Sequence, residues 1–251
     1  MPFNRMRKII LILPLVLLAL LVPQACAWKW TTHRAVAKAA YDQLPENVRI
    51  HLSYTIIEDG STWPDEYRDT PDPYGRTFPS SGHIQPGSRT QAAYWLTEAG
   101  KRYWENDFDN ASLYLGIASH FIADSMCLVH NVSYNEYYHN LYESQGASLT
   151  PANPAAIPNF NLEQKLTEYH DGASGKYQSW VSSQDSSIVQ EGVDLSASYT
   201  YNAWCQSLSV PLPASPEVSS SMDFRLIAVA ALVILIVVIA VGMNRYYREE
   251  F

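Results

Sequence analysis

The first regular pattern in the chain is an apolar stripe at helical spacing near residue 40. Val36, Ala40 and Leu44 recur every four residues, which places them on one face of an α-helix. Thr31-Thr32 precedes the stripe as a helix start, and Pro45 follows it as a stop. We therefore predict helices over residues 31–44 and, with a weaker stripe, 47–57.

Later segments repeat this pattern. Residues 90–106 are amphipathic, with Ala93 and Leu96 on the apolar face, and Leu113 to His130 is apolar enough for a mostly buried helix. Asp109-Asn110 is its predicted cap, and Ser133 is the cap of the next helix. A Pro-rich connector at 148–160 precedes predicted helices over residues 161–169, 174–181 and 187–208. We see no β-hairpin pattern, repeat or Gly-rich phosphate loop, so the predicted fold class is all-α.

The stretch from Glu58 to Thr90 interrupts the helical pattern. It contains five prolines with several glycines and aspartates, which predicts a long ordered loop or a series of turns. Loops of this length inside compact domains tend to be functional. Asp65 in Gly60-Ser-Thr-Trp-Pro-Asp65 and His83 in Ser81-Gly-His83 lie within it, and neither is more than a turn residue on its own evidence.

The first 27 residues have the pattern of a signal peptide. Arg5, Arg7 and Lys8 form a basic start, Ile9 to Val22 is apolar, and Ala25-Cys26-Ala27 is a small-residue cleavage site. Cleavage there leaves Trp28 as the mature N-terminus. Two alternatives are a lipoprotein-type cleavage before Cys26, which Gln24 fits poorly, and an uncleaved anchor.

The other end of the chain has the pattern of a membrane anchor. Leu226 to Met243 is 18 residues without a charge, and a spanning helix needs about 20 apolar residues. Arg245 and Arg248 follow it, which favours a cytoplasmic tail. The predicted organisation is a signal peptide (1–27), one domain (28–209), a Pro/Ser-rich tether (210–224), a transmembrane helix (225–244) and a short tail (245–251). The domain is thereby predicted to lie outside the cytoplasm at the cell membrane.

Charge and cysteine content limit the function only mildly. Loss of the signal peptide takes the formal net charge from -8 to -11, and an acidic surface does not favour long nucleic acids. Cys127 and Cys205 remain in the mature chain and form a disulfide only if the fold brings them together. Asn110-Ala-Ser and Asn131-Val-Ser match the N-glycosylation acceptor pattern.

The densest chemistry lies between residues 120 and 143. His120/Asp124 and His139/Glu143 are each spaced i, i+4, so each pair lies on one helix face and is able to bind one metal ion. His130 lies between the pairs. A ligand set of nitrogen and oxygen suits a catalytic zinc site. The competing interpretation is a buried polar network without metal, but buried His and Asp need partners, and one metal supplies all of them.

Read together, these elements resemble the zinc-dependent phospholipase C family, whose superfamily includes the single-strand-specific zinc nucleases of fungi and plants. The resembling pattern is a mature N-terminal Trp, an early His, a loop Asp, a His after Gly, then H-x3-D-x5-H and H-x3-E. It spans Trp28 to about Glu143. The resemblance implies a compact multi-helix domain and hydrolysis of a phosphodiester.

The resemblance also implies a ligand set for three zinc ions. One ion would be held by the α-amino group and carbonyl of Trp28, by His33 and by Asp124. A second would be held by Asp65, His83, His120 and again by Asp124. The third would be held by His130, His139 and Glu143. Asp65 would in addition orient or deprotonate the attacking water, or be a ligand only.

Three features depart from the family pattern or leave it open. Cys127-Leu128 stands where the family commonly has Gln-Pro. The short interval from Trp28 to His33 resembles the nuclease branch. Asp59 competes with Asp65 for the loop position, with Asp69 and Asp72 as more distant candidates. His51 and His170 match no motif position and are interpreted as surface or structural residues.

The expected function is therefore a membrane-anchored phospholipase C-like hydrolase that releases phosphorylated head groups from a phospholipid. A nuclease or nucleotidase of the same architecture, with a nucleic-acid substrate, is the first alternative. A zinc-binding surface domain without turnover is the second. The presence of every ligand that the resemblance implies argues against the second alternative.

Overall fold

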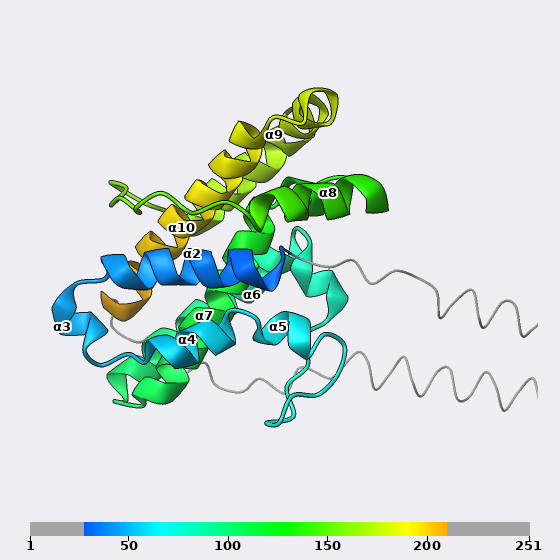
Figure 1. Cartoon of the computed structure of the whole chain (residues 1–251). Helices are drawn as coiled ribbons and strands as arrows, with labels where there is room; N and C mark the ends of the chain where they lie inside the picture. The colour runs from blue at the N-terminus through cyan, green and yellow to red at the C-terminus, as the bar shows by residue number, and fades with distance from the viewer. Residues whose placement is uncertain (1–27, 210–251) are drawn as a thin grey trace, which may run out of the picture. The chain divides into compact units, whose positions relative to one another are not determined.

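The computed structural model describes residues 28–209 and is all-α over that range (Figure 1). Only two isolated β-bridges interrupt the helical structure there, Arg68 with Phe78 and Pro71 with Thr77. The elements are α2 (Trp30–Gln43), α3 (Glu46–Arg49), α4 (Tyr54–Gly60), α5 (Trp63–Glu66), η1 (Ser80–His83), α6 (Gly87–Trp104), α7 (Phe108–Met126), η2 (Leu128–His130), α8 (Glu136–Gly146), α9 (Leu162–Ser183) and α10 (Ser186–Ser209).

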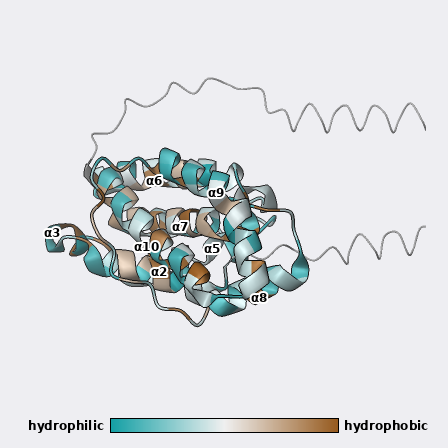
Figure 2. Cartoon of the chain, turned by 90° about the horizontal axis from the view of Figure 1, so that it is seen from above, coloured by the Kyte–Doolittle hydropathy of each residue, from teal (hydrophilic) through white to brown (hydrophobic). Residues whose placement is uncertain are grey.

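Helix α7 is the centre of this bundle. It packs against α2, α4, α6 and α10, and it lies between α6 and α2 in Figure 2. Of its 19 residues, 15 are buried, so it is covered on nearly all sides rather than along one stripe. The sequence predicts this burial, because residues 113–130 are mostly apolar or small.

Two glycines set the approach of α4 to α7. A Cβ atom on Gly116 would lie 2.3 Å from the carbonyl oxygen of Ile57, and one on Gly60 would lie 2.5 Å from the carbonyl oxygen of Leu113. The two backbones are therefore in direct contact at this crossing, which only residues without a side chain allow. This contact holds the end of α4, and with it the start of α5, against the central helix.

Several predicted helix boundaries differ from the structure because another residue is the cap. Helix α7 begins at Phe108, where the carboxylate of Asp107 accepts a hydrogen bond from the Asn110 backbone, so Asp109-Asn110 lies inside the helix. Helix α8 is capped by Asn135, not Ser133. Helix α6 begins at Gly87, three residues before the predicted start.

Two predictions of helix continuity are wrong. The predicted helix at 47–57 is two short helices, α3 and α4, because Ser53 begins a new helix by accepting a hydrogen bond from the Ile56 backbone. The two helices predicted at 161–169 and 174–181 are a single helix, α9. It continues through Gly172 and Gly175, because the apolar residues on its buried face stabilise helical backbone that the glycines alone disfavour.

The predicted loop at 58–90 contains α5 and η1 and is ordered by its own aspartates. One carboxylate oxygen of Asp72 accepts hydrogen bonds from the backbone of Tyr74 and Arg76, each at 2.8 Å, and the other accepts from Trp63 Nε1 at 3.0 Å. Asp69 accepts from the backbone of Ser80 at 2.9 Å. These bonds give the loop one conformation without a long helix or strand.

The Pro-rich connector runs along α10 and is held by polar side chains spaced eight and four residues apart. Asp194 accepts from the Ala152 backbone at 2.7 Å, Asn202 accepts from the Ile157 backbone at 2.8 Å, and Gln206 donates to the Phe160 carbonyl at 2.6 Å. One face of α10 thus supplies the hydrogen bonds that an extended segment lacks internally.

The predicted signal peptide, tether, transmembrane helix and tail lie outside the described residues. Within residues 28–209, no helix combines the length and the apolar character that crossing a membrane requires. The predicted domain boundaries therefore stay predictions.

A substitution of Asn202 tests whether hydrogen bonds from α10 hold the connector. Its amide donates to the Ala155 carbonyl at 2.9 Å as well as accepting from Ile157. We expect Asn202→Ala to lower the free energy of unfolding by about 2 kcal/mol, because two backbone groups lose their partner. Urea denaturation measures this. The control Gln178→Ala, at an exposed site on α9, should change it by less than about 0.5 kcal/mol; equal effects would contradict this role of Asn202.

Candidate metal centre

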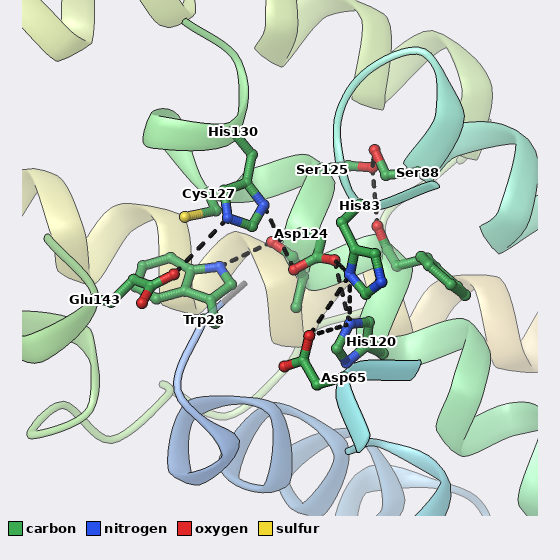
Figure 3. A network of polar contacts seen from close by, with 12 residues as sticks. Trp28, Asp65, His83, Ser88, His120, Asp124, Ser125, Cys127, His130 and Glu143 are labelled. Atoms are coloured by element: carbon green, nitrogen blue, oxygen red, sulfur yellow. Dashed lines mark hydrogen bonds and ion pairs between the residues drawn. The ribbon is translucent and has the colours of Figure 1, made fainter. Parts of the chain in front are cut away.

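Residues from six elements converge at the C-terminal end of α7, and Figure 3 shows those from α5, η1, α7, η2 and α8. Helix α2 contributes His33, α5 contributes Asp65 and η1 contributes His83. Helix α7 itself carries His120 and Asp124. Beyond α7, η2 carries His130 and α8 carries the remaining pair, His139 and Glu143. All the side chains predicted as ligands therefore meet in one place. Trp28 is not among them, because its predicted ligands are backbone groups.

Asp124 lies at the middle of this cluster. Its Oδ2 atom is 2.8 Å from His83 Nδ1 and 3.2 Å from His120 Nε2. Its Oδ1 atom faces the other way, 3.6 Å from His33 Nε2 and 3.6 Å from His130 Nδ1. One carboxylate thus contacts histidines from four different elements, which is the arrangement of a bridging ligand.

Asp65 is the loop aspartate that reaches the histidines. Its Oδ1 atom is 3.7 Å from His83 Nδ1 and 3.7 Å from His120 Nε2. Asp59 is exposed on α4. Asp69 and Asp72 are occupied by the hydrogen bonds that order their own loop. The geometry therefore favours Asp65 over each of the three alternatives.

A second group lies on the other side of Asp124. His130 Nε2 is 3.8 Å from Glu143 Oε1, and His139 Nε2 is 3.5 Å from the same oxygen. The rings of His130 and His139 are stacked, with their centroids 5.3 Å apart. These three residues form one of the groups whose ligand atoms all lie within 4.8 Å of one another; the other two are His33–Asp65–His120 and His83–His120–Asp124.

These spacings fit metal ions better than hydrogen bonds. Two ligands at about 2.0–2.2 Å from one tetrahedral zinc lie about 3.3–3.6 Å apart, close to the separations around Asp124 Oδ1 and Glu143 Oε1. Both of those oxygens are buried without a hydrogen-bond partner, as are both ring nitrogens of His33 and the Nε2 atoms of His83 and His139. Buried polar atoms without partners are costly, and zinc bound there would give partners to Asp124 Oδ1, Glu143 Oε1, His139 Nε2 and the His33 Nε2 atom that faces Asp124.

Burial sets the protonation of the ligands. It lowers the pKa of His33, an effect that neighbouring His120 strengthens, and it lowers the pKa of His139 to about 4, with His130 adding to the shift. Burial raises the pKa of Glu143 to about 7. Burial also opposes ionisation of Asp124, but His120 and the hydrogen bonds from His120 and His83 hold its pKa well below the usual value. The lowered pKa values of His33 and His139 favour the neutral imidazole that binds a divalent metal, whereas Asp124 and Asp65 outweigh burial and raise the pKa of His120.

Backbone and hydroxyl groups fix the orientation of these side chains. His120 Nδ1 donates to the Ser61 carbonyl at 2.9 Å, which leaves Nε2 facing Asp65 and Asp124. The hydroxyls of Ser88 and Ser125 are hydrogen-bonded at 2.8 Å and tie the start of α6 to α7. Because the hydrogen bond at Nδ1 fixes the orientation of the ring, Nε2 points in a defined direction as a metal ligand.

Trp28 is anchored beside the cluster. Its side chain is fully buried and its Nε1 atom donates to the Ala123 carbonyl at 2.9 Å. Its ring packs on Tyr142, and a Cβ atom on Gly146 would lie 2.1 Å from it, so α8 fits this ring only with glycine there. The side chain of the predicted mature N-terminal residue is therefore held against the residue that precedes Asp124. Ligation by its α-amino group and carbonyl stays a prediction.

Arg68 is the residue that sequence reasoning missed. Its guanidinium forms an ion pair with Asp65, and its side chain is only 6% exposed. Its charge adds to the burial that lowers the pKa of His83 and His139. The only sequence signal is its position three residues after Asp65, which places both on one side of a helical turn.

The two cysteines are not paired with each other. Both are free, and Cys127 is fully buried behind His130 (Figure 3). Burial raises the pKa of the Cys127 thiol, and the nearby carboxylates of Glu143 and Asp124 add to the shift. Cys127 is therefore a small buried side chain close to the metal centre, and it is kept in the unreactive thiol form.

Comparison with known proteins agrees with this geometry. Two solved structures share the fold: the alpha toxin from Clostridium absonum, with a TM-score of 0.51 over 76% of this chain at 15% identity, and the Clostridium perfringens alpha-toxin from an avian strain, with a TM-score of 0.51 over 80% at 15% identity. This chain covers 66% and 67% of those chains, about two thirds of their length. No curated protein sequence matches it.

The sequence profile of the family described as zinc-dependent phospholipase C matches residues 32–185. This range includes all the converging side chains from His33 to Glu143. The central helix, the acid–histidine clusters and the family match agree, and the chain belongs to the zinc-dependent phospholipase C family.

Proposed function

We propose that this protein is a zinc-dependent phosphodiester hydrolase that releases phosphorylated head groups from phospholipids. The observation that supports it most strongly is Asp124, whose two carboxylate oxygens face separate histidine groups. A carboxylate in that position would hold two metal ions, which would supply the Lewis acidity used for displacement at phosphorus.

The proposed ligand assignment follows the resemblance and the distances. His33 and Asp124, with the mature N-terminus at Trp28, hold one ion. The third ion lies with His130, His139 and Glu143. The second ion is held by Asp124 together with Asp65, His83 and His120. Bound zinc supplies Lewis acidity and lowers the pKa of a coordinated water.

The chain's own residues supply orientation and charge. Asp65 faces His83 and His120 and lies beside Arg68, so it is placed to accept a proton from the attacking water or to orient it. The Arg68 guanidinium presents fixed positive charge where negative charge develops on the phosphoryl group. Because Arg68 is already paired with Asp65, it is held in place beside the ligands, where it is able to attract an anionic phosphate.

A lipid substrate is supported by the ends of the chain. An apolar segment at 225–244 that anchors the domain outside the cytoplasm would keep the site near a membrane, and the negative net charge disfavours long nucleic acids. The short interval between Trp28 and His33 supports the second candidate, a single-strand nuclease or nucleotidase of the same architecture.

The substrate class is tested by a direct comparison. The full-length protein, processed so that Trp28 is its first residue, is incubated with phosphatidylcholine vesicles and with single-stranded DNA. We expect chelator-sensitive release of phosphorylated head group, because both the ligands and the anchor favour a lipid. Cleavage of DNA alone would place the protein in the nuclease branch. Bound zinc without either activity would favour the non-catalytic alternative.

The ligand assignment is tested with isosteric changes. We expect Asp124→Asn and Asp65→Asn to weaken zinc binding by about 100-fold, because each removes a charged oxygen that faces two histidines. Asp59→Asn is the matched control and should bind zinc as the unaltered protein does. Competition with a coloured chelator measures the affinity. Zinc loss from Asp59→Asn but not from Asp65→Asn would reverse the loop assignment.

The role of Arg68 is tested by separating turnover from metal content. We expect Arg68→Met to lower kcat by about 100-fold, as the loss of one transition-state donor does, while the zinc content stays unchanged. Arg49→Met, on α3, is the control and should retain full kcat. An unchanged kcat in Arg68→Met, or a parallel loss of zinc, would show that Arg68 only supports Asp65.

A further inference from the structure

The turn that follows α7 has to keep two metal ligands in register. Asp124 lies in the last turn of α7 and His130 lies at the end of η2, and their side chains are 3.6 Å apart. The helix ends at Met126, and the last carbonyl groups of a helix have no partner within it. The backbone N–H groups of His130 and Asn131 bond to the Cys127 and Leu128 carbonyls, each at 3.0 Å, and a side-chain donor adds to these bonds where the helix ends.

The side chain of Asn131 does this. Its Nδ2 atom donates to the Ser125 carbonyl at 3.0 Å and to the Cys127 carbonyl at 2.8 Å. These carbonyls lie on either side of the end of α7, and both hydrogens of the amide are used. Because Asn131 directly follows His130, the same residue that closes the turn also fixes the backbone next to the metal ligand.

Helix α9 fixes the amide from the other side. The Oδ1 atom of Asn131 accepts a hydrogen bond from His170 Nδ1 at 2.8 Å. With both N–H groups given to carbonyls, this oxygen is only an acceptor, so His170 must carry its proton on Nδ1. His170 thus has a specific role, although the sequence pattern leaves it as a surface or structural residue.

We propose that Asn131 is a positioning residue for the metal ion at His130, His139 and Glu143, with His170 as its support. The proposal rests on the metal-binding role proposed above for His130. It also reinterprets Asn131-Val-Ser, because an N-linked glycan is attached through the Nδ2 atom that holds the turn. The glycosylation pattern at Asn131 and the observed turn exclude each other.

The principal test is Asn131→Asp in the full-length zinc-loaded protein. The change keeps the shape but removes both N–H donors and places a carboxylate against two carbonyl oxygens. We expect one zinc ion to bind 10–100-fold more weakly, the usual effect of losing a group that orients a ligand, while the remaining zinc is unaffected. Chelator competition measures this, and the visible spectrum of the Co²⁺-substituted protein should change only in the bands that His139→Ala abolishes.

Matched variants separate positioning from general destabilisation. Asn153→Asp is the same chemical change at an exposed site in the connector and should leave zinc binding and the Co²⁺ spectrum unchanged. His170→Ala removes one of the three hydrogen bonds of the Asn131 side chain. Because His170 is exposed, this variant should fold, and it should bind the same zinc ion several-fold more weakly. His170→Gln retains a donor and should restore the affinity.

Two results would overturn the proposal. The first is unchanged affinity and an unchanged Co²⁺ spectrum in both Asn131→Asp and His170→Ala. If Asn131→Asp does not fold, His170→Ala alone decides by the same criterion. The second is weaker binding of all ions together, which indicates a purely structural role. A third outcome is distinct from these two results. If His139→Ala binds as many zinc ions as the unaltered protein, the proposed metal site at His130, His139 and Glu143 is itself wrong.

Discussion

The structure depends on one buried charge, the Asp124 carboxylate at the end of α7. An ionised carboxylate without solvent is strongly unfavourable unless opposite charge or directed hydrogen bonds compensate it. Four histidines from four elements surround it; His120 comes from α7 itself, and the chain outside α7 brings the other three. Without a metal, two of these contacts are hydrogen bonds and the two at Oδ1 are too long, so the compensation is complete only with bound cations.

Close packing of backbones makes this convergence possible. The crossing of α4 and α7 at Gly60 and Gly116 brings the Ser61 carbonyl within hydrogen-bonding distance of His120. Gly146 accommodates the Trp28 ring, which in turn bonds to the Ala123 carbonyl next to Asp124. His120 and Trp28 are thus oriented by main-chain groups, which move less than side chains and cost little conformational entropy to fix.

The charge expected at the metal-loaded site is opposite in sign to the net charge of the whole chain. The chain carries a formal net charge of -8, yet the loaded centre would combine zinc ions with the Arg68 guanidinium inside a buried cluster. Burial lowers the pKa of His33 and His139 and so reduces their repulsion of the metal. The resulting local positive charge suits a single phosphate group, whereas the acidic surface disfavours the extended phosphate backbone of a nucleic acid.

The sequence by itself determined the all-α fold, the long helices to within a few residues apart from α9, which it divided into two, and the pairs His120/Asp124 and His139/Glu143. Helical periodicity and i, i+4 spacing are local properties. His33, Asp65 and His83 entered through the resemblance to a family, since their positions in the chain carry no local signal. Only the tertiary structure decided that Asp65 rather than Asp59 faces the histidines, that Arg68 lies beside it, and that Asn131 and His170 hold the turn after α7. These contacts join residues from separate elements, and their geometry depends on how closely the helices pack.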